Sequence, residues 1–158
     1  MICLIIALIL LIITAVLFFW QNEYLTAECR GTILFAWPVR AGETFELTFT
    51  HSVNQSPITD VIEWTGEDLS VVKSIFKTFG AGVPVPADGV GTELVFVDGH
   101  YELIGIDKHM KGFSVITQET PNQKIIFNGR EADLIDITGP GKPVYITVRR
   151  LPFFLVSK

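Results

Sequence analysis

Residues 2–20 read ICLIIALILLIITAVLFFW, a run without charge in which Thr14 is the only clearly polar side chain. A helix needs about 20 consecutive apolar residues to cross the hydrocarbon layer of a bilayer, so the run predicts a membrane segment. Cleavable signal peptides have a shorter apolar region, a positively charged start and a small-x-small exit, and none of these is clear here. The run therefore favours an uncleaved single-pass anchor over a cleaved signal segment.

The distribution of charge predicts on which side of the membrane the rest of the chain lies. Every Lys, Arg, Asp and Glu follows Trp20, so the net charge of −5 belongs to the remainder of the chain. The amino terminus is the only positive group before the run, while Glu23 and Glu28 follow it, which favours an inside N-terminus. We therefore expect a membrane protein with an extracytoplasmic domain, and its acidic character argues against nucleic acid as a partner.

The chain after the apolar run has the pattern of an all-β domain. Short stretches of β-branched and aromatic residues are broken by Gly, Pro and Asn, and no amphipathic helix of three turns is present. We expect residues 21–30 to be a connector and residues 31–158 to form an antiparallel β-sandwich or a partly open barrel. The expected strands are 31–37, 43–53, 58–66, 69–79, 92–98, 100–106, 113–119, 124–128, 130–136 and 143–150. Asp98-Gly99 and Asn128-Gly129 have the composition of two-residue hairpin turns.

The first predicted hairpin brings a histidine and an aspartate together. Strict alternation places one set of side chains on a single strand face: Phe45, Leu47, Phe49, His51 and Val53. If residues 54–57 form a four-residue loop, His51 lies opposite Asp60 with Cβ atoms about 4.5–5.5 Å apart. The same register pairs Val53 with Ile58, Phe49 with Ile62 and Leu47 with Trp64. Because an unpaired buried carboxylate costs several kcal/mol, we expect these two side chains to hydrogen-bond on the inward face.

Such a pair has a structural and a functional interpretation. It is expected to raise the pKa of the imidazole and to lower the pKa of the carboxyl. It would clamp the end of the hairpin or line a small binding site. It also resembles two members of a catalytic triad, but the spacing specifies no nucleophile, because Ser52 must point to the opposite face from His51.

Residues 79–86 read FGAGVPVP and form the second conspicuous segment. Two glycines separated by alanine permit close backbone approach and positive φ, and the prolines stiffen the exit. A phosphate-binding loop would require a following helix, which the prolines disfavour. The segment is either a stiff crossover between sheets or a loop that faces a ligand. In the second case the predicted functional corner comprises His51, Asp60, Gly80, Ala81, Gly82 and Pro84.

Four side chains that can bind metal ions lie close together in the sequence: His100, Glu102, Asp107 and His109. Their spacing matches no strong zinc pattern, and exposed loop histidines are common. The two cysteines, Cys3 and Cys29, leave no pair within the domain for a disulfide framework or a zinc site. The residues therefore indicate neither a metal nor a cofactor.

Arg149-Arg150 precede the apolar sequence LPFFLV near the end of the chain. A basic pair followed by apolar side chains is able to pack on a sheet, to touch a lipid surface or to meet a partner protein. Packing on the sheet is the interpretation that we favour from the sequence.

The motifs Thr50-His51-Ser52-Val53, Pro57-Ile58 with Asp60, and residues 79–84 resemble a family of small bacterial proteins of unknown function. Its members carry an N-terminal hydrophobic segment and are often encoded beside TAXI-type TRAP transporters. The resemblance covers about residues 32–150 and includes the closing stretch from Gly129 to Ile146. It implies an accessory role at an extracytoplasmic membrane face, assisting a solute-binding protein or a permease in carboxylate uptake.

Three functional hypotheses follow from the sequence. The first is a non-enzymatic, membrane-anchored accessory or binding module for a TRAP-type solute transporter, with the predicted functional corner as its site. The second is a hydrolase or metal-dependent enzyme that uses His51 and Asp60. The third is a structural protein of the cell envelope.

Overall fold

The computed structural model describes residues 5–6, 8–11, 14, 21–53, 55–78, 86 and 89–152. The described members of the apolar run are helical and exposed, with 50–66% of each large hydrophobic side chain accessible. Within the described ranges, no helix combines the length and the apolar composition that crossing a membrane requires.

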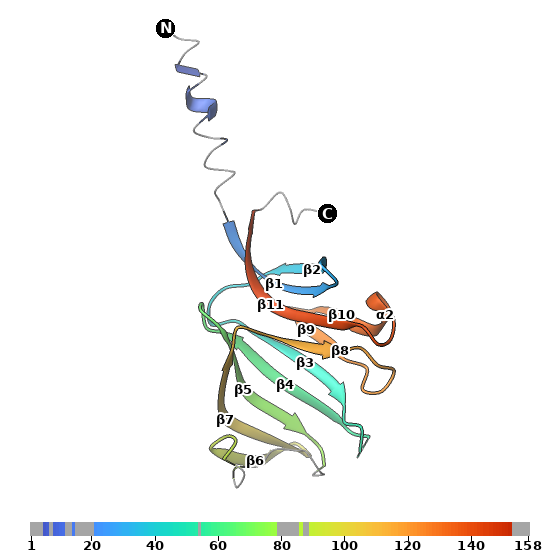
Figure 1. Ribbon diagram of the computed structural model, residues 1–158. Coiled ribbons are helices and arrows are strands. Elements are labelled where there is room, and N and C mark those ends of the chain that lie inside the picture. Colours follow the sequence, from blue (N-terminus) through green and yellow to red (C-terminus); the bar gives the residue numbers. More distant parts are fainter. Residues whose placement is uncertain are drawn as a thin grey trace.

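From residue 21 onward the chain is mostly β, and it forms two antiparallel sheets that do not close into a barrel (Figure 1). The four-stranded sheet has the order β2 (Thr32–Pro38), β1 (Gln21–Cys29), β11 (Pro143–Pro152) and β8 (Gly112–Ile116). The seven-stranded sheet has the order β10 (Arg130–Asp133), β9 (Lys124–Phe127), β3 (Thr44–Thr50), β4 (Pro57–Trp64), β5 (Leu69–Phe76), β7 (His100–Met110) and β6 (Glu93–Val97). The short helix α2 (Leu134–Thr138) follows β10.

Most predicted strands are confirmed, and so are both predicted two-residue hairpins. Val97 pairs with His100 across Asp98-Gly99, and Phe127 pairs with Arg130 across Asn128-Gly129. Asp98 and Gly99 have φ angles of 48° and 83°, and Asn128 and Gly129 have 48° and 75°. Positive φ at both central residues is the requirement of the type I′ turn, whose twist matches that of the flanking strands.

The predicted connector at residues 21–30 is wrong, because this segment is strand β1. It pairs with both β11 and β2, and its Leu25 and Ala27 side chains are fully buried. Its polar composition is accommodated by cross-strand ion pairs, such as Arg149 Nη2 to Glu28 Oε2 at 2.7 Å. The turn that ends it, Arg30-Gly31, has φ angles of 52° and 83° and is a further two-residue hairpin. The β domain therefore begins directly after the apolar run.

The strand predicted at 130–136 ends earlier, at Asp133, where helix α2 begins. The Asp133 carboxylate accepts hydrogen bonds from the backbone N–H groups of Ile135 (3.2 Å) and Asp136 (3.4 Å). A side chain that satisfies free N–H groups at a helix start stabilises the helix by about 1 kcal/mol. The cap at Asp133 therefore favours a helical turn where the sequence predicted the end of a strand.

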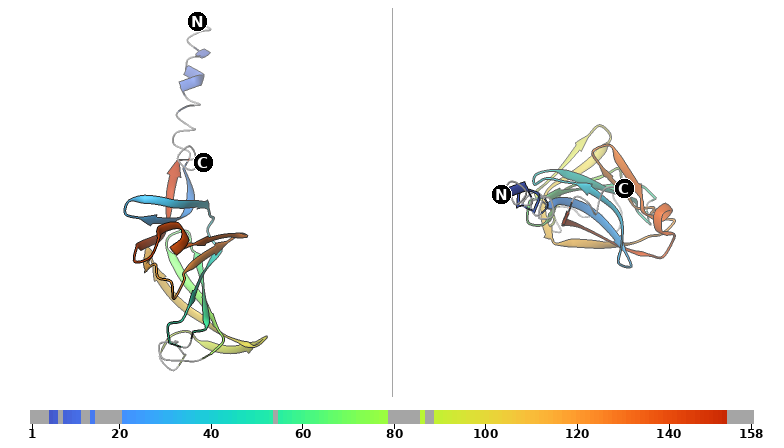
Figure 2. Two further views of the ribbon diagram at one scale, coloured as in Figure 1. Left: turned by 90° about the vertical axis from the view of Figure 1, so that its right-hand side faces the viewer. Right: turned by 90° about the horizontal axis from the view of Figure 1, so that it is seen from above.

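One hydrophobic cluster takes fully buried side chains from both sheets, including Leu25 and Ile146 from the first and Phe45 and Ile125 from the second. A smaller cluster contains Ile58, Phe76 and Leu103 of β4, β5 and β7. Figures 1 and 2 show β6 and the adjoining part of β7 extending beyond the four-stranded sheet. The larger cluster is therefore the core that joins the two sheets, and the smaller one belongs to the seven-stranded sheet.

Candidate functional site

The predicted pairing of His51 with Asp60 is wrong. In the observed register Asp60 lies opposite Leu47, four positions along β3 from its predicted partner, and the last pair before the turn is Thr50 with Pro57. His51 therefore lies in the loop at 51–56, which His51 N–H closes by donating to the carbonyl of Ser56 at 2.9 Å. The turn is longer than predicted, with Gln55 at a φ of 50°.

His51 faces a backbone donor rather than a carboxylate. Its Nδ1 accepts a hydrogen bond from the N–H of Val53 at 3.3 Å, within the same loop. Because His51 belongs to the loop, it does not lie on the strand face where the alternation predicted it. The histidine therefore supports the turn locally.

Asp60 does face inward, as predicted, but with another partner. It lies on β4 between the buried residues Ile58 and Ile62, and its Oδ1 accepts a hydrogen bond from Ser74 Oγ at 2.7 Å. Desolvation by burial raises the pKa of the Asp60 carboxyl, against smaller opposing effects of the Ser74 hydrogen bond and the positive charge of Lys108. Because burial disfavours the ionised form, the Asp60 carboxyl takes up its proton at a higher pH than an exposed aspartate does.

The predicted glycine-containing part of the functional corner, comprising Gly80, Ala81, Gly82 and Pro84, lies outside the described residues. At the edge of this segment the hydroxyl of Thr78 donates to Ser56 Oγ at 2.9 Å. That contact ties the end of β5 to the loop that contains His51. Asp60 accepts its hydrogen bond from Ser74, so His51 and Asp60 do not form a single site.

The histidines of β7 bind carboxylates in two separate places. His100 Nε2 lies 3.2 Å from Glu102 Oε1, and Lys73 Nζ lies 3.1 Å from the other oxygen of Glu102. His109 lies 3.0 Å from Asp68 and 2.8 Å from Asp107. Asp107 and His109 are on β7 rather than in the predicted loop, because this strand extends to Met110. Across the described part of the chain, no group of three or more His, Cys, Asp or Glu side chains is arranged so that it could hold a metal ion.

We expect His109→Gln to lower thermal stability near neutral pH and to have little effect at high pH. Hydrogen bonds to Asp68 and Asp107 raise the pKa of His109, and the His109 hydrogen bond lowers the pKa of Asp68. The stabilisation is therefore present at about pH 6, is lost as pH rises through the raised pKa of His109, and is lost in acid as Asp68 becomes protonated. The difference in Tm between the two proteins across pH measures it.

The matched control is Thr48→Val, which removes a hydrogen bond of 3.1 Å between the hydroxyls of Thr48 and Thr59 and no titratable group. We expect its difference in Tm from the parent protein to stay constant over the same pH range. An equal pH dependence in both variants would contradict the assignment of the effect to the Asp68–His109–Asp107 cluster.

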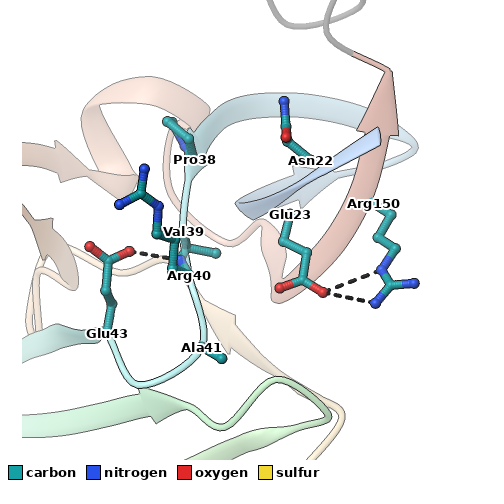
Figure 3. A pocket seen from close by; sticks show the side chains of 8 residues that line it. All are labelled: Asn22, Glu23, Pro38, Val39, Arg40, Ala41, Glu43 and Arg150. Carbon is teal, nitrogen blue, oxygen red and sulfur yellow. Dashed lines mark hydrogen bonds and ion pairs between the residues drawn. The ribbon is translucent and has the colours of Figure 1, made fainter. Parts of the chain in front are cut away.

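A cleft of about 880 Å³ lies where β1 starts and β11 nears its end. Figure 3 shows its lining in two groups, the segment 38–43 on one side and residues of β1 and β11 on the other. The lining residues are Asn22, Glu23, Pro38, Val39, Arg40, Ala41, Glu43 and Arg150. The sequence pattern did not bring these residues together, and of them only Arg150 stood out, as part of the basic pair Arg149-Arg150.

The first wall of this cleft is a hydrogen-bonded turn. Glu43 N–H donates to the carbonyl of Arg40 at 3.0 Å, and Arg40 N–H donates to Glu43 Oε2 at 2.7 Å. Gly42, at a φ of 85°, donates its N–H to the carbonyl of Trp64 at 2.7 Å. A turn that is bonded to itself and to β4 fixes the backbone from which Arg40 and Glu43 project.

The second wall is centred on Glu23. One carboxylate oxygen accepts from Trp64 Nε1 at 2.8 Å, and the other accepts from Arg150 Nε and Nη2, each at 3.2 Å. These bonds join the start of β1 to the end of β11 and to β4. Glu23 therefore fixes Arg150 in the cleft while leaving 72% of its side chain exposed.

Arg40 supplies a second guanidinium to the cleft. Its side chain makes no hydrogen bond or ion pair with any other residue that the structure describes. A guanidinium presents five N–H donors in a planar fork that matches carboxylate and phosphate oxygens. The cleft therefore offers one fully available guanidinium and one that is partly engaged.

The family model described as "Domain of unknown function (DUF1850)" matches residues 45–134, which is more than half of the chain. Neither the curated proteins nor the solved structures contain a match. His51, Asp60 and His109 fall inside the matched region, whereas all residues that line the cleft fall outside it. By this match the chain belongs to the DUF1850 family.

Proposed function

We propose that this chain is a non-enzymatic, membrane-anchored binding module that works at the extracytoplasmic face as an accessory to a TRAP-type solute transporter. The observation that carries the proposal is the position of the cleft. Asn22 and Glu23, which line it, are the second and third residues after Trp20, where the apolar run ends. A polar recess at that position is available to a partner or ligand at the membrane surface.

The apolar run supports the anchor part of the proposal. Its described residues are helical, and side chains such as Leu8 (56% exposed) and Leu11 (66% exposed) have no cover from the β domain. The Thr14 hydroxyl donates to the carbonyls of Leu10 (2.7 Å) and Leu11 (2.9 Å), so its polar atom is satisfied within the segment. Exposed apolar residues with internally satisfied polar groups suit a lipid environment.

A core shared by the two sheets supports a sandwich-like packing of the domain. Such packing would hold the cleft rigidly. Leu25, Val144 and Ile146 of the four-stranded sheet pack in the same cluster as Phe45 and Trp64 of the seven-stranded sheet. Binding residues held on packed strands keep their geometry better than residues on free loops. The cleft draws Glu23 from β1 and Arg150 from β11, which are neighbours in that sheet.

The alternative of a His51- and Asp60-dependent hydrolase has no supporting geometry. Each residue hydrogen-bonds to a different group, Val53 N–H for His51 and Ser74 Oγ for Asp60. General-base catalysis requires the base and the group that orients it to lie within hydrogen-bond reach. A structural envelope protein would need the fold but would have no use for an accessible polar cleft.

Co-purification with a transporter tests the proposal. The tagged full chain is extracted from its native membrane in mild detergent, and we expect a TRAP permease or its solute-binding protein to elute with it. The control replaces residues 2–20 with an unrelated membrane-spanning helix, which should retain the partner because the β domain makes the contact. Elution of the chain alone, or its recovery without detergent in the soluble fraction, would overturn the proposal.

A further inference from the structure

We propose that the cleft binds a zwitterionic group carrying a phosphate and a primary ammonium, and that this group is the headgroup of a phospholipid in the leaflet beneath the domain. The inference rests on the proposed membrane anchor and names a ligand for the binding module. It concerns the cleft lined by Arg40, Glu43, Glu23 and Arg150.

The lining is balanced in charge. Two guanidinium groups, of Arg40 and Arg150, face a cleft that also contains the carboxylates of Glu23 and Glu43. Separated charges of both signs match a ligand that itself carries both, whereas a purely anionic ligand would meet two carboxylates. The net charge of −5 further disfavours an anionic lipid, because the domain as a whole repels it.

The guanidinium groups suit the phosphate. Arg40 has all of its side-chain donors available to a ligand, and Arg150 uses only Nε and Nη2 on Glu23. Arg–phosphate contacts are charge-assisted and frequently bidentate, which gives them both strength and orientation. Asn22, which also lines the cleft, adds an amide that donates to oxygen.

The carboxylate of Glu43 suits the ammonium. One of its oxygens accepts the Arg40 N–H at 2.7 Å, and the other has only a 3.5 Å contact with Asn128 Nδ2. An ionised carboxylate has about four acceptor positions, so Glu43 retains capacity for the N–H donors of a primary ammonium. The quaternary ammonium of a choline headgroup has no N–H and cannot make these bonds.

The distance from the apolar run places the cleft at headgroup level. Glu23 is three residues beyond Trp20, and strand residues rise about 3.3 Å each, so it lies within about 10 Å of the end of the run. Pro152, at the end of β11, pairs with Gln21, and the sequence after it continues with the apolar residues FFLV. Gln21 and Pro152 therefore lie at the same end of the sheet, and each is adjoined in the sequence by apolar residues.

The experiment uses the full chain in nanodiscs of phosphatidylcholine, titrated with water-soluble phosphoethanolamine and followed by calorimetry. We expect saturable binding, about tenfold weaker binding in Arg40→Gln, and unchanged binding in Arg30→Gln, a matched substitution in the β1–β2 turn. Glu43→Gln keeps an oxygen acceptor for Arg40 N–H and should bind phosphoethanolamine no better than phosphocholine. Binding that is equal in all variants, or absent altogether, would overturn the inference.

A second arm distinguishes the source of the ligand. If the lipid headgroup is the natural occupant, phosphatidylethanolamine in the nanodisc should occupy the cleft and abolish the response to free phosphoethanolamine. An undiminished response would overturn the lipid assignment and indicate a free zwitterionic solute. Neither arm involves the transporter, so failure here is separable from failure of the co-purification test.

Discussion

A chain that begins at Gly31 is expected to remain unfolded, whereas a chain that begins at Gln21 should fold cooperatively. The reason is that β1 lies between β2 and β11, so its loss removes the strand that connects them. It also removes the fully buried Leu25 and Ala27 from the main core. Losing one buried leucine side chain costs about 2–5 kcal/mol, and a small domain has only about 5–15 kcal/mol in total. Circular dichroism during urea unfolding measures the outcome.

Point substitutions in the full-length protein provide the control for this truncation. Leu25→Ala should lower the free energy of unfolding by about 2–5 kcal/mol. Ile33→Ala, on the neighbouring strand β2 where the side chain is 41% exposed, should lower it by less than about 1 kcal/mol. A cooperative, near-native transition in the chain that begins at Gly31 would show that residues 21–30 are the connector that the sequence predicted.

Alternation and turn chemistry were sufficient to predict most of the strands. The inward residues of β3, Phe45 and Leu47, are buried as their alternation requires, and the Asn128-Gly129 turn has the positive φ angles of its type. Strand β1 escaped because QNEYLTAEC contains only short apolar stretches among polar residues. Its burial depends on cross-strand partners from β11, which is distant in sequence, and local patterning carries no information about them.

The register of the first hairpin could not be settled by hydrophobic pattern. The observed pairing differs from the predicted one by four positions, which is an even number, so the residues that remain in the ladder keep their predicted faces. Only the length of the loop distinguishes the two registers, and the six-residue loop at 51–56 is closed by a hydrogen bond from His51 to Ser56. The inward position of Asp60 was therefore predictable, but its partner was not.

The cleft could not be predicted from the local sequence either, because its residues come together only through contacts between distant parts of the chain. Its charged residues lie in three separate parts of the chain, and only the pairing of β1 with β11 brings Glu23 beside Arg150. The turn at Arg40–Glu43 reaches them because Val39 N–H donates to the carbonyl of Glu23 at 3.0 Å. Once β1 is assigned to a connector, nothing in the sequence predicts a site at this end of the domain.

Trp64→Ala should lower the free energy of unfolding by about 3–5 kcal/mol, because it empties a large volume in the core that joins the two sheets. The side chain is only 7% exposed, and its Nε1 donates to Glu23 Oε2 at 2.8 Å. Urea unfolding followed by circular dichroism measures the loss without relying on the fluorescence of the residue that is removed. The same variant should also weaken ligand binding in the cleft, since Glu23 loses one of the bonds that fix it.

Trp64→Phe separates packing from hydrogen bonding at this position. Phenylalanine retains most of the buried ring but cannot donate to Glu23, so we expect a loss of about 1 kcal/mol. Glu23 keeps its contacts with Arg150 in this variant, so the cleft should keep its shape although Glu23 is held by fewer hydrogen bonds. If Trp64→Phe were as destabilising as Trp64→Ala, the hydrogen bond to Glu23 would contribute more to stability than the packing of the ring. If both were neutral, Trp64 would not belong to the core that supports the cleft.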